Sequence, residues 1–265
     1  MTRMILTGIL AVAAGISSFG PPSLLAQQPP AKQGQAQGQG MVPGAKSPGE
    51  SQAIIALVQA QGNADATIKA AEDLLGKYAD TTFKETALLA EAEAYRSKND
   101  PDKAQIYGER VVEVNPKSFQ ATLLLGEILA SRTRENDLDK EEKLTKADKY
   151  LNSTIDNLKT ATKPNPQITD QQWEDGKKWI TAQAHNDLGL VALTRKKYDV
   201  AITEFKTAAD GDPQPAYSVR LASAYQLAGK NDEAIAICDK LLADPQLHPQ
   251  IKAVATNVKA AASKK

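Results

Sequence analysis

The sequence contains few residues of the types that perform nucleophilic or metal chemistry. Its 265 residues include two histidines, His185 and His248, and one cysteine, Cys238. A metal site needs three or four such side chains around the ion, and a nucleophile needs a base within hydrogen-bond reach. The adjacent acids Glu141 and Glu142 would lie on different faces of a helix. We therefore expect no catalytic residues and no metal ligands, and we interpret His185 and Cys238 as packing residues.

One segment has the residue types of a phosphate-binding loop. It runs from Gly40 to Ser47 in the order Gly-Met-Val-Pro-Gly-Ala-Lys-Ser. Such a loop needs a strand before it and a helix that begins at the lysine, so that backbone N–H groups converge on the phosphate. Here a Gln- and Gly-rich stretch precedes it, and Pro48 and Gly49 follow. We expect no nucleotide site at this segment and no other cofactor.

The charges are balanced, with 32 basic and 32 acidic residues. A nucleic-acid-binding surface usually gathers Lys and Arg on one face, whereas here basic and acidic residues alternate along the chain. Nucleic acid is therefore not an expected partner.

The N-terminal residues have the pattern of a secretory signal. Arg3 precedes an apolar stretch from Met4 to about Phe19, and small residues lead to Ala26. The apolar stretch is shorter than the roughly 20 residues that span a bilayer. We expect a signal peptide at 1–26 that is cleaved after Ala26, with an uncleaved anchor as the alternative. The mature chain is then expected to lack a transmembrane segment and to be exported, either periplasmic or secreted.

The remainder divides into a tether and a helical body. Residues 27–50 are rich in Gln, Gly and Pro and nearly devoid of apolar side chains, which predicts disorder. From about Ser51, apolar residues and alanines recur at i, i+3, i+4 and i+7, the period of amphipathic helices. Asp100 followed by Pro101 predicts a helix start, and one long helix is expected from about Asp170. We predict an all-α domain over 51–265.

Short helices separated by prolines invite a search for internal repeats. The segment that begins at Ala182 carries the pattern Leu188, Gly189, Ala192, Ala201, Phe205, Ala208 and Pro213. It resembles the 34-residue tetratricopeptide repeat (TPR), a helix-turn-helix unit. The resemblance implies a right-handed superhelical solenoid of such repeats, closed by a C-terminal capping helix. Gly189 and Ala201 stand where the two antiparallel helices of the unit are expected to approach most closely.

The same pattern, laid on the neighbouring segments, predicts the whole repeat domain. The expected units are 51–84, 85–118, 119–166, 182–214 and 215–248, followed by a cap helix at 249–262. The third unit contains about nine extra residues around the charged stretch 132–137, given the ideal period of 34. A long inter-helix turn or an extended helix pair would accommodate them.

The resemblance also implies a binding surface, because the first helices of such repeats line a concave groove. It places these residues there: Leu89, Glu93, Arg96, Leu123, Glu127, Gln183, Asn186, Leu190, Leu193, Val219, Ser223, Gln226 and Leu227. Glu93 and Glu127 hold the same position in consecutive repeats, which predicts a small acidic patch. The C-terminal half of the groove is predicted to be apolar.

The two tryptophans are predicted to have different roles. Trp179 continues the groove stripe of Gln183 and Asn186 at helical spacing, so we interpret it as an anchor for a partner. The alternative is that Trp179 packs beneath residues 164–166. Trp173 is assigned to the core because it aligns with the apolar face of Ile180, Ala184, Leu188 and Val191.

These features favour an exported scaffold that binds a protein or peptide in its groove. A structural subunit of a cell-envelope assembly is the alternative, and an enzyme of unrecognised type is a remote one. The sequence identifies neither the partner nor the oligomeric state.

Overall fold

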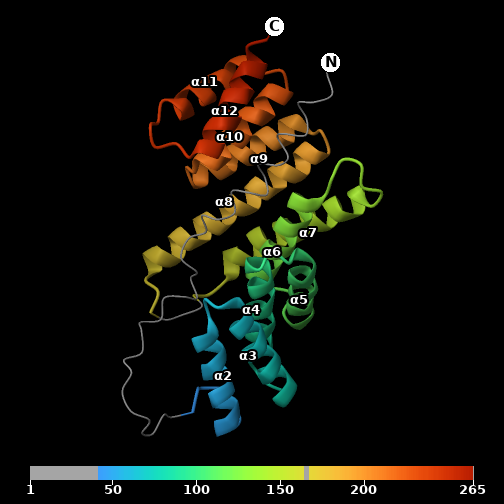
Figure 1. Ribbon diagram of the computed structural model, residues 1–265, viewed down its shortest axis with the longest axis vertical. Coiled ribbons are helices and arrows are strands. Elements are labelled where there is room, and N and C mark those ends of the chain that lie inside the picture. The colour runs from blue at the N-terminus through green and yellow to red at the C-terminus, as the bar shows by residue number, and fades with distance from the viewer. Residues whose placement is uncertain (1–40, 164–166, 265) are drawn as a thin grey trace. The chain divides into compact units, whose positions relative to one another are not determined.

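The computed structural model describes residues 41–163 and 167–264, so the predicted signal peptide and most of the predicted tether lie outside it. All regular secondary structure in the described residues is helical, which confirms the all-α prediction. Figure 1 shows the helices in chain order. They are α2 (Pro48–Ala60), α3 (Ala64–Lys77), α4 (Lys84–Ser97), α5 (Pro101–Val114), α6 (Phe119–Arg132), α7 (Lys140–Thr160), α8 (Asp170–Thr194), α9 (Tyr198–Gly211), α10 (Pro215–Leu227), α11 (Asn231–Leu242) and α12 (Pro249–Ala262).

Capping side chains and prolines fix the helix starts. The carboxylate of Asp100 accepts the backbone N–H of Lys103 at 3.1 Å, and Pro101 is the first residue of α5. This confirms the start predicted from these two residues. A reciprocal capping box begins the long helix α8, in which Thr169 and Gln172 each accept the other's backbone N–H. Both devices satisfy N–H groups that have no partner within the helix.

The folded body begins earlier than the sequence predicts. α2 starts at Pro48, inside the segment 27–50 that was assigned to a disordered tether. Ala45 is buried against α2 and α3, and the N–H of Val42 donates to the hydroxyl of Ser51 at 2.8 Å. These contacts attach the last part of the predicted tether to the first helix pair, although its composition is poor in apolar residues.

The described chain forms two compact units, residues 41–128 and residues 129–264, which we call the N-terminal unit and the C-terminal unit. Within each unit, helices that follow one another in sequence pack together, as α2 to α5 do in the first and α7 to α12 in the second. This serial packing of antiparallel helix pairs is the architecture that the sequence predicts.

The N-terminal unit is held together by alternating small and large apolar side chains. Leu57 of α2, Leu74 of α3 and Ala87 of α4 form one buried cluster. At α5, a Cβ atom added to Gly108 would lie 3.1 Å from the side chain of Leu125 in α6. A glycine here therefore lets α6 approach α5 closely.

In the C-terminal unit, α8 and α9 approach closely at Gly189. A Cβ atom there would lie 2.5 Å from a ring carbon of Phe205. Phe205 and Ala201, both on α9, are fully buried. Gly189 thus makes room for the aromatic ring, and the prediction that Gly189 and Ala201 mark a close approach of two helices is confirmed.

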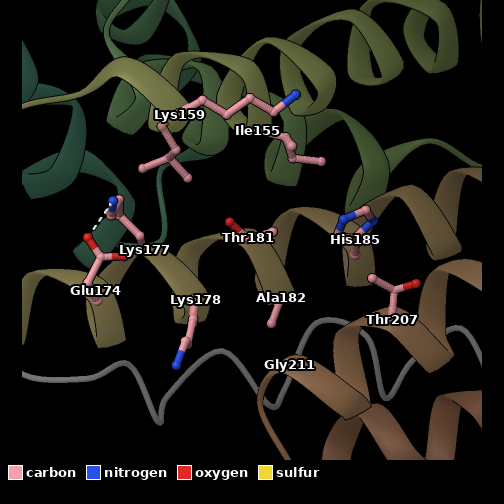
Figure 2. Close-up of a pocket in the computed structure, with 11 residues that line it drawn as sticks. Ile155, Lys159, Glu174, Lys177, Lys178, Thr181, Ala182, His185, Thr207 and Gly211 are labelled. Carbon is pink, nitrogen blue, oxygen red and sulfur yellow. Dashed lines mark ion pairs between the residues drawn. The ribbon is translucent and has the colours of Figure 1, made fainter. Parts of the chain in front are cut away.

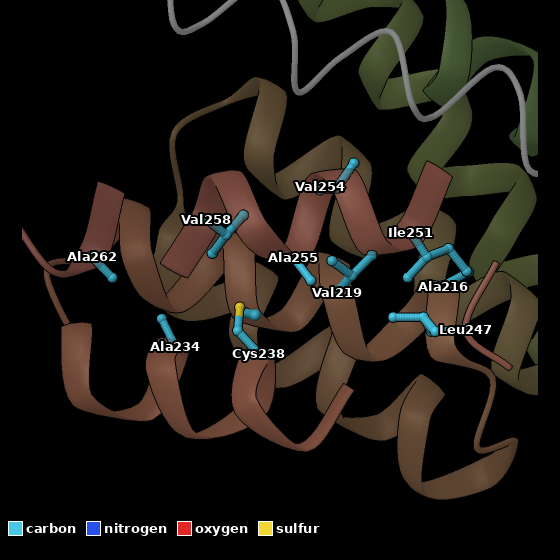
Figure 3. Close-up of a cluster of buried hydrophobic side chains, with 11 residues drawn as sticks. Ala216, Val219, Ala234, Cys238, Leu247, Ile251, Val254, Ala255, Val258 and Ala262 are labelled. Atoms are coloured by element: carbon cyan, nitrogen blue, oxygen red, sulfur yellow. The ribbon is translucent and has the colours of Figure 1, made fainter. Parts of the chain in front are cut away.

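The last helix covers the end of the C-terminal unit. Figure 3 shows the apolar face of α12, including Val258 and Ala255, directed at Val219 of α10 and Cys238 of α11. Cys238 is fully buried, as expected for a packing residue, and this burial raises the pKa of its thiol. α12 is the capping helix that the repeat pattern predicts.

The insertion predicted in the third unit has two structural consequences. Residues 133–139 form a turn after α6, and α7 is lengthened to 21 residues. Arg195, at the end of α8, donates to Glu141 at 2.9 Å and to Thr145 at 3.2 Å, and it also pairs with Asp148. The longer α7 is therefore fastened to the end of the long helix α8.

Candidate functional site

The described residues contain no group of three or more His, Cys, Asp or Glu side chains arranged to hold a metal ion. Within the same part of the chain, no helix combines the length and the apolar character that a membrane span requires. His185 lies 2.7 Å from a carboxylate oxygen of Glu204, so it links α8 to α9. Lys46, in the segment that has the residue types of a phosphate loop, donates to the side chain and the backbone carbonyl of Asp80 at 2.6 Å.

Helix α8 presents three stripes, which we define by their residues. The core stripe is buried, which confirms the core assignment of Trp173; it comprises Trp173, Ile180, Ala184, Leu188 and Val191. The groove stripe is the predicted one and comprises Trp179, Gln183, Asn186, Leu190 and Leu193. The third, the pocket stripe, comprises Glu174, Lys178, Thr181 and His185. At about 100° per residue, the groove stripe and the pocket stripe flank the core stripe on opposite sides.

Two predicted groove residues of the N-terminal unit are buried. Leu89 packs in a cluster with Val111 of α5 and Ala121 of α6. Leu123 of α6 is only 9% exposed. Both assignments to an accessible groove are therefore corrected, because neighbouring helices cover positions that the repeat pattern places on the surface.

Three predicted groove residues of the C-terminal unit are buried as well. Val219 belongs to the cluster under α12, and the hydroxyl of Ser223 donates to the carbonyl of Val219 at 2.9 Å. Asn186 donates to Asp187 at 2.9 Å and accepts from Arg220 at 2.6 Å. Of these three side chains, Asn186 ties α8 to α10, and none is available to a partner.

The other predicted groove residues retain some exposure. In the C-terminal unit, they are Trp179, Gln183, Leu190, Leu193, Gln226 and Leu227. Leu190 and Leu193 of α8 contact the buried cluster that contains Leu221 and Ala224. An apolar stripe thus remains partly open beside α10.

Trp179 is partly buried. The two predictions were an exposed anchor and a packed residue, and the observed burial is intermediate between them. Residues 164–166, under which it would pack in the second case, lie outside the described part of the chain. Its role as an anchor remains a prediction.

The predicted acidic patch of the N-terminal unit is neutralised from within the chain. Arg96 donates to Glu93 at 2.9 Å and to Glu127 at 3.4 Å. Burial by itself would lower the pKa of Arg96, but the two carboxylates outweigh this effect and raise it. One guanidinium therefore joins two carboxylates from consecutive repeats, and little acidic character is left for a partner.

A buried carboxylate in the same unit escaped the sequence analysis. Glu91 of α4 is 1% exposed, and one of its oxygens has no hydrogen-bond partner among the described residues. Burial, followed by the charge of Glu72, raises the pKa of Glu91 to about 7, although Arg110 and a hydrogen bond from Tyr107 oppose the shift. The signal that could have found it is its position in α4, where the helical period of apolar residues predicts a buried side chain.

A pocket in the C-terminal unit was not predicted either. It has a volume of about 390 Å³, within the range of about 300–1,000 Å³ typical of ligand clefts. Figure 2 shows residues of α8 along its floor, with residues of α7 and α9 on either side. The residues around it include Ile155, Lys159, Lys178, Thr181, His185 and Gly211.

Comparison with known proteins supports the repeat pattern. The family model described as "Tetratricopeptide repeat" matches residues 89–144 and 186–249. A solved thermophilic TPR protein of Thermus thermophilus superimposes with a TM-score of 0.50 and 22% identity, over 80% of this chain and 98% of that one. This likeness shows a shared fold. The sequence matches none of the curated proteins.

A weaker structural match is residues 1–338 of the assembly chaperone of RpL4. Its TM-score is 0.48 at 12% identity, over 80% of this chain and 95% of that chain.

Proposed function

Because this chain belongs to the tetratricopeptide-repeat family, we propose that it is an exported protein-interaction scaffold that holds a protein or peptide on the groove stripe of its C-terminal unit. Chains with these repeats generally serve as scaffolds rather than as enzymes. Their stacked helices present extended surfaces that are suited to peptide segments.

The observation that carries the proposal is the partly open surface of α8 and α10. Leu190 and Leu193 are only partly covered by the cluster they contact. Gln183, earlier on the same stripe of α8, and Gln226 on α10 are partly exposed. Apolar side chains bordered by amides can bury a partner's side chains while hydrogen-bonding its backbone.

The groove has a rigid base. The hydrogen bond of 2.6 Å from Arg220 to Asn186 ties α10 to α8 beneath this surface. A rigid surface loses little conformational entropy on binding, so more of the contact energy contributes to affinity.

Site-specific photocrosslinking tests the proposal. A photoreactive residue would replace Gln183 or Gln226 in the groove, and Thr203 or Lys206 on the exposed face of α9 as controls. In envelope extracts, we expect discrete adducts from the groove positions and none from α9. Identical adducts from both faces, or none from the groove, would contradict the proposal. Stoichiometric co-purification of one partner before crosslinking would instead favour the structural subunit.

Export is supported by the signal pattern that ends at Ala26. Expression of the full chain in a bacterium followed by osmotic shock tests it. We expect the protein in the periplasmic fraction, with its new N-terminus at Gln27. An intact N-terminus in the cytoplasmic fraction would exclude export.

A further inference from the structure

The pocket exists because α8 is longer than the helix beside it. α9 ends at Gly211, whose Cβ position lies 3.6 Å from the Cβ of Ala182. α8 begins at Asp170, so several of its turns extend past the end of α9. The C-terminal part of α7, with Ile155 and Leu158, borders this extension. The pocket therefore depends on the extra length of α7 and α8 rather than on the repeat unit.

The pocket is separate from the proposed groove. Most of its residues on α8 belong to the pocket stripe, which the core stripe separates from the groove stripe, and Lys177 and Ala182 also line it. α7 and α9 flank it (Figure 2), whereas α10 borders the groove stripe. A ligand in the pocket and a partner in the groove would occupy different faces of α8.

The chemistry of the pocket combines a basic rim with an apolar interior. Lys159, Lys177 and Lys178 line it, and Glu174 is the one carboxylate among the lining residues. Ile155 and Gly211 supply apolar surface above the buried side chains of Leu158 and Ala182. This combination favours an anionic group joined to an apolar one.

The three lysines differ in how they are paired. Lys177 lies 2.7 Å from Glu174 and Lys159 lies 2.7 Å from Asp156, each on its own helix. Lys178 is exposed and forms no ion pair with the described residues. Ion pairs between helix residues three apart are weak, at about 0.2–0.5 kcal/mol, so a ligand's carboxylates can compete for these ammonium groups.

We propose that this pocket binds an acidic segment of a partner protein, with Asp or Glu side chains at the lysine rim and an apolar side chain against Ile155. The inference rests on the proposed function as a scaffold and gives the scaffold a second contact. The chain's own residues 27–40 do not fit this site, because they contain Lys32 and no acidic residue.

Peptide arrays with the full-length chain test this proposal. One set of decapeptides contains Asp, Glu and Leu in varied orders, and the matched set has Asn and Gln in place of the acids. The tightest acidic peptides are then measured by fluorescence anisotropy. We expect them to bind at least about tenfold more tightly than their neutral counterparts, as charge complementarity requires. Equal binding by the two sets, or no binding by either, would overturn the proposal.

Charge reversal locates the binding. The double variant Lys159→Glu and Lys178→Glu should reduce affinity for the acidic peptide at least about tenfold. Lys206→Glu is the matched control, because Lys206 is exposed on α9 outside the pocket. If the control loses as much affinity as the double variant, general charge attraction explains the binding and the pocket does not.

The two proposals fail in different ways. Trp179→Ala changes the groove and should leave acidic-peptide affinity unchanged while it reduces partner crosslinking. If acidic peptides bind but no groove crosslinks form, only the proposal for the groove is refuted. Groove crosslinks with no preference for acidic peptides would refute the pocket alone.

Discussion

The two units carry the same repeat positions on their first helices but use them differently. In the N-terminal unit, charged side chains meet one another, and Arg96 pairs with Glu93 and Glu127. In the C-terminal unit, Leu190 and Leu193 lie partly open beside α10. Ion pairing satisfies charges within the chain, whereas half-covered apolar side chains gain more from a partner. A repeat position therefore indicates where a side chain lies but not whether it is available.

The interiors differ in a parallel way. The N-terminal unit buries a carboxylate, Glu91, between helices. The C-terminal unit also buries a carboxylate, Asp187, but its closest helix contact fits the ring of Phe205 into the space beside Gly189. The buried Glu91 makes the stability of the N-terminal unit depend on pH. The fit of Phe205 makes the stability of the C-terminal unit depend on the size of the side chain at position 189.

The largest expected effect is at Gly189. Gly189→Leu should destabilise the C-terminal unit by about 3 kcal/mol or more, because the new side chain would force α8 and α9 apart. Urea unfolding followed by tryptophan fluorescence measures it, since both tryptophans of the chain, Trp173 and Trp179, lie in this unit.

A glycine of the N-terminal unit serves as the control. No atom lies within 4 Å of a Cβ placed on Gly76 in α3. Gly76→Ala should stabilise its unit by about 0.5–1 kcal/mol, because it removes conformational entropy from the unfolded chain. Circular dichroism measures this change, since the N-terminal unit contains no tryptophan. Unchanged stability in Gly189→Leu would disprove the close packing of α8 and α9.

The next effect is a pH dependence in the N-terminal unit. The pKa of Glu91 is about 7 in the folded chain against an ordinary 4.5. The folded state therefore holds this proton more tightly, so stability is greatest below about pH 4.5 and falls as pH rises toward 7 and beyond. The loss should be on the order of 3 kcal/mol at pH 8.

Glu91→Gln should remove this dependence, because the amide is neutral and still accepts a hydrogen bond from Tyr107. Hydrogen exchange of the α4 amides, measured by mass spectrometry at pH 5 and pH 8 and corrected for intrinsic rates, compares the variant with the parent chain. Glu93→Gln, on the same helix and partly exposed, is the control. Parallel pH curves for the parent chain and Glu91→Gln would show that the buried carboxylate is not responsible.

Much of the fold could be predicted because local patterns determine it. The cap at Asp100, the start of α8 near Asp170 and the core position of Trp173 all follow from residue type and helical period. The close approach at Gly189 follows from the spacing of the repeat.

The accessibility of the site could not be predicted in the same way. Spacing gives the direction of a side chain, but the burial of Leu89 and Val219 depends on how far the neighbouring helices cover it. Glu91 was missed because a carboxylate at a core position departs from the pattern. The pocket beside Lys178 depends on α8 extending past α9, which is a tertiary property.

A smaller effect is expected in the groove of the C-terminal unit. Trp179→Ala should cost about 2 kcal/mol of partner binding free energy, as typical anchor residues do. The melting temperature of this variant should differ little from that of the parent chain, because Trp179 is only partly buried. Lys206→Ala, on the exposed face of α9 outside the groove and the pocket, is the control for partner crosslinking at Gln226. A large loss of helicity in Trp179→Ala would identify Trp179 as a core residue.

The smallest effect is expected at Arg96. Arg96→Ala should destabilise the N-terminal unit by less than about 1 kcal/mol at low salt, because the ion pairs are exposed. About 1 M salt should remove the difference by screening. Thermal unfolding followed by circular dichroism measures both values, with Lys98→Ala, which breaks another exposed pair, as the control. A loss that persists in high salt would contradict a screened surface pair.

Arg96→Ala also tests why the surfaces formed by the first helices of the repeats differ between the two units in their availability to a partner. Without Arg96, the carboxylates of Glu93 and Glu127 are left unneutralised on consecutive repeats. If internal pairing is what makes this surface unavailable, Arg96→Ala should bind a lysine-rich peptide more tightly than the parent chain does, and salt should weaken that binding. Fluorescence anisotropy measures this affinity. Equal affinities would mean that the position of the carboxylates, and not their pairing, separates the N-terminal unit from the C-terminal unit.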